Sequence, residues 1–91
     1  MDVKGKTAVV TGGASGIGRG IARCLASNAM NVVLADIEQP PMDEMVAELT
    51  AMGTAAMGVQ TDVSKLDQVE ALAAAALDRF GAVHEIGRAH V

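Results

Sequence analysis

The sequence predicts an α/β domain built on a parallel sheet. Short apolar runs alternate with helix-forming stretches, and the first apolar run leads directly into a glycine-rich turn that opens a helix. This alternation is typical of parallel sheets, because a crossover between parallel strands needs a connection long enough to hold a helix. We expect about three strands, in the sheet order 3-2-1, and three helices.

The boundaries of these elements follow from apolar runs and helical spacing. The expected strands cover residues 7–11, 31–35 and 55–61, and the expected helices cover residues 17–27, 41–52 and 65–80. The apolar face of the first helix is expected to hold Ile17, Ile21, Cys24 and Leu25. That of the second is expected to hold Met42, Met45, Val46, Leu49 and Met52, with the methionines as core residues and not metal ligands. Ser64 and Asp67 resemble a capping box for the third helix.

The turn after the first strand carries the strongest functional signal. It contains three glycines with separate uses: Gly12 lets the chain turn tightly, Gly16 lets the backbone approach a pyrophosphate, and Gly18 lets the new helix pack closely. The helix then directs free N–H groups and its positive dipole end at the phosphates. The loop predicts a dinucleotide site on a Rossmann-type doubly wound sheet. The residues assigned to it are Thr11, Gly12, Ser15, Gly16, Ile17 and Gly18.

Two further positions are expected at the same edge of the sheet. Asp36 closes the second strand, where a carboxylate accepts hydrogen bonds from an adenosine ribose, and Ile37 follows it. The third apolar run ends in Asp62 and Val63. Three coupled features at successive strand ends favour nucleotide binding over a purely structural turn.

These residues together resemble the short-chain dehydrogenase/reductase family. The resemblance covers residues 4–84 and is carried by the T-G-x-x-x-G-x-G pattern, the acid after the second strand, and the Asp62-Val63 pair, which in that family contacts the adenine. It implies an NAD(P)-dependent oxidoreductase whose parent protein would transfer hydride between a nicotinamide cofactor and an alcohol or carbonyl substrate. It also implies that the parent is a homo-oligomer.

NAD is favoured over NADP as the cofactor. The carboxylate of Asp36 suits a free ribose 2′-hydroxyl and would repel a 2′-phosphate. Relatives that prefer NADP usually carry a basic residue at the position of Ser15 or just after the acid, where this chain has Ile37. Arg19 is the cation that remains within reach of the ribose.

The end of the chain departs from the family pattern. Residues 85–91 look like the translation of a common sequencing adapter, so we divide the chain into residues 1–84, the N-terminal part of an NAD(P)-binding domain, and an expected non-native tail. The exposed edge of the first strand is then expected to stay unpaired. The family's catalytic Asn, Ser and Tyr-x-x-x-Lys positions have no match, and the sequence contains no tyrosine. We therefore assign no catalytic residue and expect these 91 residues alone to be inactive.

Composition limits the other partners. Seven basic and eleven acidic residues give a net charge of −4, which offers no basic patch for nucleic acid. No apolar run is long enough for a membrane span, and no metal-ligand spacing is present, so we expect a cytoplasmic protein without a metal. Two other function classes stay open: a non-catalytic nucleotide-binding module and a fragment of a Rossmann-type methyltransferase.

Overall fold

The computed structural model describes residues 4–83 and 85–88. Its elements follow in the order β1 (Thr7–Thr11), α1 (Gly16–Ser27), β2 (Asn31–Asp36), α2 (Gln39–Ala51), β3 (Ala56–Gln60), α3 (Leu66–Phe80) and β4 (Glu85–Arg88). The six elements expected up to residue 80 are confirmed, with ends that differ by two residues at most. The largest difference is at α2, which begins two residues early so that the two prolines fill its first turn.

All four strands form one parallel sheet in the order β3-β2-β1-β4. The predicted order 3-2-1 is confirmed. Register pairs Thr11 with Ala35, and Asp36 with Gln60, so β1, β2 and β3 finish at the same edge of the sheet. The residues that follow these strands therefore meet at that edge, which is where the ligands of open parallel sheets bind.

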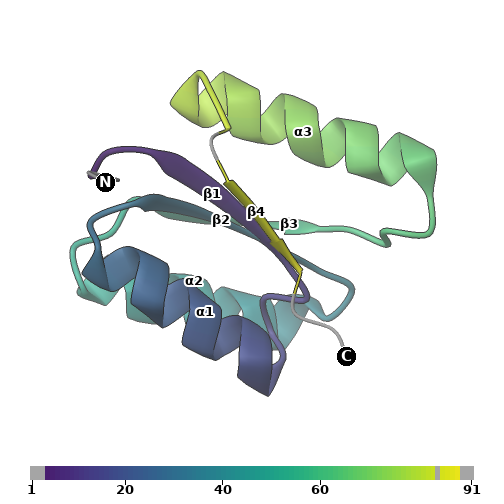
Figure 1. Ribbon diagram of the computed structural model, residues 1–91. Helices are drawn as coiled ribbons and strands as arrows, with labels where there is room; N and C mark the ends of the chain where they lie inside the picture. The colour runs from purple at the N-terminus through teal and green to yellow at the C-terminus, as the bar shows by residue number, and fades with distance from the viewer. Residues whose placement is uncertain (1–3, 84, 89–91) are drawn as a thin grey trace.

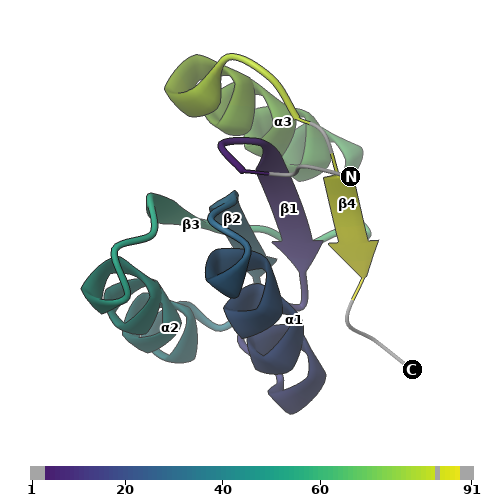
Figure 2. The same ribbon diagram turned by 60° about the vertical axis from the view of Figure 1, so that its left-hand side comes forward.

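The fourth strand corrects two expectations from the sequence. The strand count was one short, and the outer edge of β1 is paired, because β4 runs parallel to it from Ala8 opposite Glu85 to Thr11 opposite Arg88. Figure 2 shows the two arrows side by side, pointing the same way. Strand pairing uses backbone N–H and C=O groups, which almost any sequence supplies, so composition did not reveal it. The division of the chain at residue 84 stays a prediction, and residues 84 and 89–91 lie outside the described residues.

Helices cover both faces of the sheet (Figure 1). Helices α1 and α2 lie against one face and α3 lies against the other. Alternate residues of β2 serve the two layers: Val32 and Leu34 pack with α1 and α2, whereas Val33 and Ala35 pack with α3. This two-sided burial explains why β2 reads as an unbroken apolar run.

Two helix faces differ from the prediction. In α1 the buried residues are Gly18, Ala22 and Ala26. Of the residues predicted for this face, Ile21 and Leu25 are partly buried against the core, whereas Ile17 is 53% exposed and Cys24 is exposed. Small residues occupy the face toward the strands because the helix lies close to the sheet there. In α2 the expected methionines are buried, apart from Met52, which follows the helix. No helix in the described part of the chain is both long and apolar enough to cross a membrane.

Candidate cofactor site

A small pocket lies at the edge where β1, β2 and β3 end. We name it the edge pocket. Its volume is about 130 Å³, and it is lined by Thr11, Gly12, Ala35, Asp36, Ile37, Thr61 and Val63. Five of these seven residues are among those assigned from the sequence. The two missed residues, Ala35 and Thr61, are buried strand-end residues with no distinctive motif.

The glycine-rich loop beside the edge pocket is held close to β2. Gly12 has a φ of +71°, a left-handed conformation that suits glycine, and its N–H donates to the Ala35 carbonyl oxygen at 2.7 Å. A Cβ atom on Gly18 would lie 2.1 Å from the Gly12 carbonyl oxygen and 2.8 Å from the Gly13 Cα. Both obstacles are backbone atoms, so the close approach of α1 to the loop requires glycine at position 18.

The first turn of α1 presents donors toward the solvent at this edge. Ser15 caps the helix: its Oγ accepts the Gly18 N–H at 3.0 Å and donates to the Gly12 carbonyl oxygen at 2.7 Å. No acceptor within the described residues pairs with the N–H groups of Gly16 and Ile17. A Cβ atom on Gly16 would meet nothing within 4 Å, so open space lies beside these donors. The geometry fits an anion such as a pyrophosphate.

Asp36 joins the end of β2 to the glycine-rich loop. Its Oδ2 accepts the Ala14 N–H at 2.9 Å, and its Oδ1 accepts the Glu38 N–H at 3.1 Å. The side chain is partly exposed and lines the edge pocket, where a carboxylate could also accept ribose hydroxyls, because its oxygens offer about four acceptor sites. The sequence did not predict the hydrogen bond from the Ala14 N–H, because nearly every residue has a backbone N–H and the residue type does not show which acceptor it meets.

Asp62 is engaged in the turn before α3. Its Oδ1 accepts from the Ser64 N–H at 2.9 Å and from the Ser64 hydroxyl at 2.6 Å, and these two bonds hold the pKa of the Asp62 carboxyl below its usual range. The expected Ser64 capping box is therefore wrong: Lys65 is the N-cap of α3, without a side-chain bond. Val63 is 53% exposed and lines the edge pocket. A role for Asp62 toward adenine stays a prediction.

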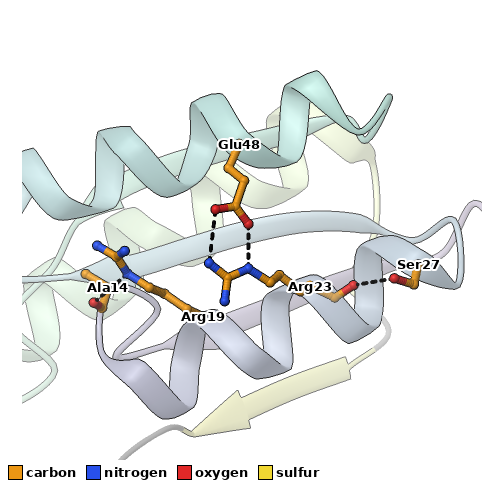
Figure 3. A network of polar contacts seen from close by, with 5 residues as sticks. All are labelled: Ala14, Arg19, Arg23, Ser27 and Glu48. Carbon is orange, nitrogen blue, oxygen red and sulfur yellow. Dashed lines mark hydrogen bonds and ion pairs between the residues drawn. The ribbon is translucent and has the colours of Figure 1, made fainter.

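Arginines of α1 connect the loop to α2 (Figure 3). The Arg19 Nε donates to the Ala14 carbonyl oxygen at 3.2 Å. The Arg19 guanidinium also lies 3.8 Å from a carboxylate oxygen of Glu44 in α2. One turn along, Arg23 makes two hydrogen bonds to Glu48, at 2.5 and 3.0 Å. The hydrogen bond from Arg23 is the main cause that lowers the pKa of the Glu48 carboxyl. Arg19 is thus turned toward α2.

A second, larger hollow lies between the sheet and α3. Its volume is about 700 Å³, and its lining is mostly apolar, from Val9 of β1 to Leu72 and Leu77 of α3. It shares Thr11 and Val63 with the edge pocket. Gly12 and Asp36 line the edge pocket and not this hollow, so the edge pocket and the adjoining loop form the better candidate for ribose and phosphate. Among the described residues, no group of three His, Cys, Asp or Glu could hold a metal ion.

Comparison with known proteins identifies the family. The sequence profile of the short chain dehydrogenase family matches residues 6–86. The chain belongs to this family. It is 40% identical over 82 residues to the short chain dehydrogenase/reductase astE of Aspergillus oryzae, an alignment that covers 89% of this chain and 31% of that protein.

Solved structures of the short chain dehydrogenase family agree closely with this fold. The first is a family member from Burkholderia phymatum in complex with NAD, which is 46% identical with a TM-score of 0.92 and covers 94% of this chain and 31% of its own. The second is a variant of actinorhodin polyketide ketoreductase with NADPH, which is 34% identical with a TM-score of 0.87 and covers 91% of this chain and 32% of its own. This chain therefore spans about a third of the length of these relatives.

Family membership confirms the Rossmann-type doubly wound fold and the dehydrogenase resemblance. The methyltransferase alternative finds no support. In family terms, the T-G-x-x-x-G-x-G pattern occupies the turn from β1 into α1, and the acidic position occupies the end of β2. The structure thus brings the loop, Asp36, Ile37 and Val63 to one edge, while the Asp62 carboxylate is bound within its own turn.

Proposed function

We propose that this chain is the cofactor-binding part of an NAD(P)-dependent oxidoreductase that transfers hydride between a nicotinamide cofactor and an alcohol or carbonyl substrate. The observation that carries the proposal is the pair of N–H groups at Gly16 and Ile17 beside open space, at the same sheet edge as the Asp36 carboxylate. The first feature suits a pyrophosphate and the second a ribose. A bound nicotinamide would supply the hydride chemistry.

We further propose a preference for NAD over NADP. A 2′-phosphate at the ribose would approach the Asp36 carboxylate, and the next residue, Ile37, offers no positive charge. Arg19, the cation that the sequence suggests for pairing with such a phosphate, is already hydrogen-bonded to the Ala14 carbonyl oxygen and lies near Glu44. Related structures contain either NAD or NADPH, so the local charges are the argument for this chain.

Titration of NAD and NADP against the protein and its Asp36→Ala variant tests both proposals. We expect NAD to bind more tightly than NADP, and the variant to lose about 10- to 150-fold in NAD affinity, because a hydrogen bond to a charged group contributes roughly 1.5–3 kcal/mol. Discrimination against NADP should relax in the variant. The control is Asp43→Ala, which removes the same charge from an exposed residue of α2. Equal affinity of the unmodified chain for both cofactors would count against the preference, and no binding of either would count against the site.

We infer that the 91 residues alone do not catalyse the reaction. The family resemblance implies that a tyrosine activated by a lysine transfers the proton during catalysis. The sequence contains no tyrosine. We expect no change in NADH absorbance when the purified chain is mixed with NAD and a panel of secondary alcohols. A full-length relative serves as the positive control. Turnover above the background of a heat-denatured sample would overturn this inference.

A further inference from the structure

We propose that Asp36 is a positioning residue that holds the glycine-rich loop ready to bind phosphate, separately from any contact it makes with ribose. This inference rests on the proposed function, since it concerns the same nucleotide site. Its basis is the pattern of hydrogen bonds between the loop and the end of β2.

Three successive N–H groups of the loop donate to the last two residues of β2. The Gly12 and Gly13 N–H groups share the Ala35 carbonyl oxygen at 2.7 and 3.3 Å, and the Ala14 N–H donates to the Asp36 Oδ2 at 2.9 Å. The Asp36 side chain thus extends the backbone contacts by one residue. That bond is the last restraint from β2 before the Gly16 N–H, two residues further along.

The Asp36 carboxylate is itself fixed at two points. Its second oxygen accepts the Glu38 N–H at 3.1 Å, so neither oxygen turns without breaking a bond. The carbonyl oxygen of Ala14 also accepts a hydrogen bond, from the Arg19 Nε. Both polar atoms of the Ala14 backbone are therefore held by charged side chains, which limits the conformations of the loop before any ligand arrives.

Electrostatics alone makes the opposite prediction. A carboxylate near an anion site repels the anion, so its removal should tighten phosphate binding. A positioning role predicts weaker binding, because a loosened loop must be ordered when the anion binds. A probe with phosphates and no ribose separates the two effects, and inorganic pyrophosphate is such a probe.

The experiment measures pyrophosphate affinity by calorimetry for the 91-residue chain, Asp36→Ala, Asp36→Asn and the Asp43→Ala control. We expect Asp36→Ala to bind pyrophosphate about tenfold more weakly. Asp36→Asn keeps one acceptor oxygen, which can serve the Ala14 N–H only if its NH2 group faces the Glu38 N–H, so its loss of affinity should be smaller than that of Asp36→Ala. Asp43→Ala should stay within about twofold. Equal or tighter binding by Asp36→Ala would overturn the proposal, and so would a loss in Asp36→Asn as large as that in Asp36→Ala.

Backbone ¹⁵N relaxation without ligand keeps this test separate from the proposed function. We expect lower order parameters from Gly13 to Ser15 in Asp36→Ala, and a smaller decrease in Asp36→Asn. Unchanged order parameters in Asp36→Ala would overturn the positioning role even if NAD binds. If the unmodified chain binds neither NAD nor pyrophosphate while the loop loosens in Asp36→Ala, the proposed function fails and the restraint on the loop stands.

Discussion

Replacement of Gly18 with alanine is expected to destabilise the domain by about 3 kcal/mol or more and to abolish NAD binding. The new Cβ atom would lie 2.1 Å from the Gly12 carbonyl oxygen, so either α1 or the loop must move. Movement of the loop would break its bonds to Ala35, and movement of α1 would open the core at Ala22. Urea denaturation followed by circular dichroism measures the loss of stability.

The matched control is Gly20→Ala in the same helix. Gly20 is exposed, and its Cβ atom would meet nothing within 4 Å. We expect this variant to be more stable by roughly 0.5–1 kcal/mol, since alanine is the better helix former. Similar stabilities for the two variants would show that α1 does not pack against the loop as described.

Replacement of Gly16 with alanine is expected to leave folding intact and to weaken NAD binding on the order of 100-fold. The protein leaves space for the new methyl group, so the free energy of unfolding should stay the same or rise slightly. The methyl group would stand beside the Gly16 and Ile17 N–H groups and keep a phosphate from them, and a hydrogen bond between charged and polar partners contributes roughly 1.5–3 kcal/mol.

Thermal denaturation and NAD titration on the same samples separate these effects. The expected result for Gly16→Ala is an unchanged midpoint with lost affinity, whereas Gly20→Ala should retain NAD affinity. If Gly16→Ala bound NAD within about threefold of the unmodified chain, the phosphates would not bind at the Gly16 and Ile17 N–H groups.

The sequence was sufficient to predict those features of the fold and the site that depend on a local pattern of residues. Strand ends were predictable because apolar runs stop at polar residues such as Asp36. The glycine-rich loop was predictable because the fold demands glycine there, and the 2.1 Å approach at Gly18 shows that demand directly. The sheet order followed from the position of the glycine-rich loop after the first strand, which is typical of this kind of sheet.

Features that depend on contacts between distant backbone groups were not predictable. Pairing of β4 with β1 uses atoms that every residue carries, so residues 85–88 gave no sign of it. The buried face of α1 depends on how closely the helix approaches the sheet, which favours Ala22 over the larger Cys24. The bond from Ala14 to Asp36 joins positions 22 residues apart, and the residue type of Ala14 does not reveal it.

The two-sided burial of β2 has a consequence for the order in which parts of the domain open. This strand is paired along both edges and covered on both faces, so its amides should exchange with solvent only through near-global unfolding. Helix α3 packs on one face of the sheet beside the larger hollow, so we expect it to separate from the sheet at a lower free-energy cost than the opening of β2. Ala35 and Asp36, which bind the glycine-rich loop, belong to β2. We therefore expect a nucleotide at this site to be held by the last part of the domain to unfold, and to stay bound during local openings that expose α3.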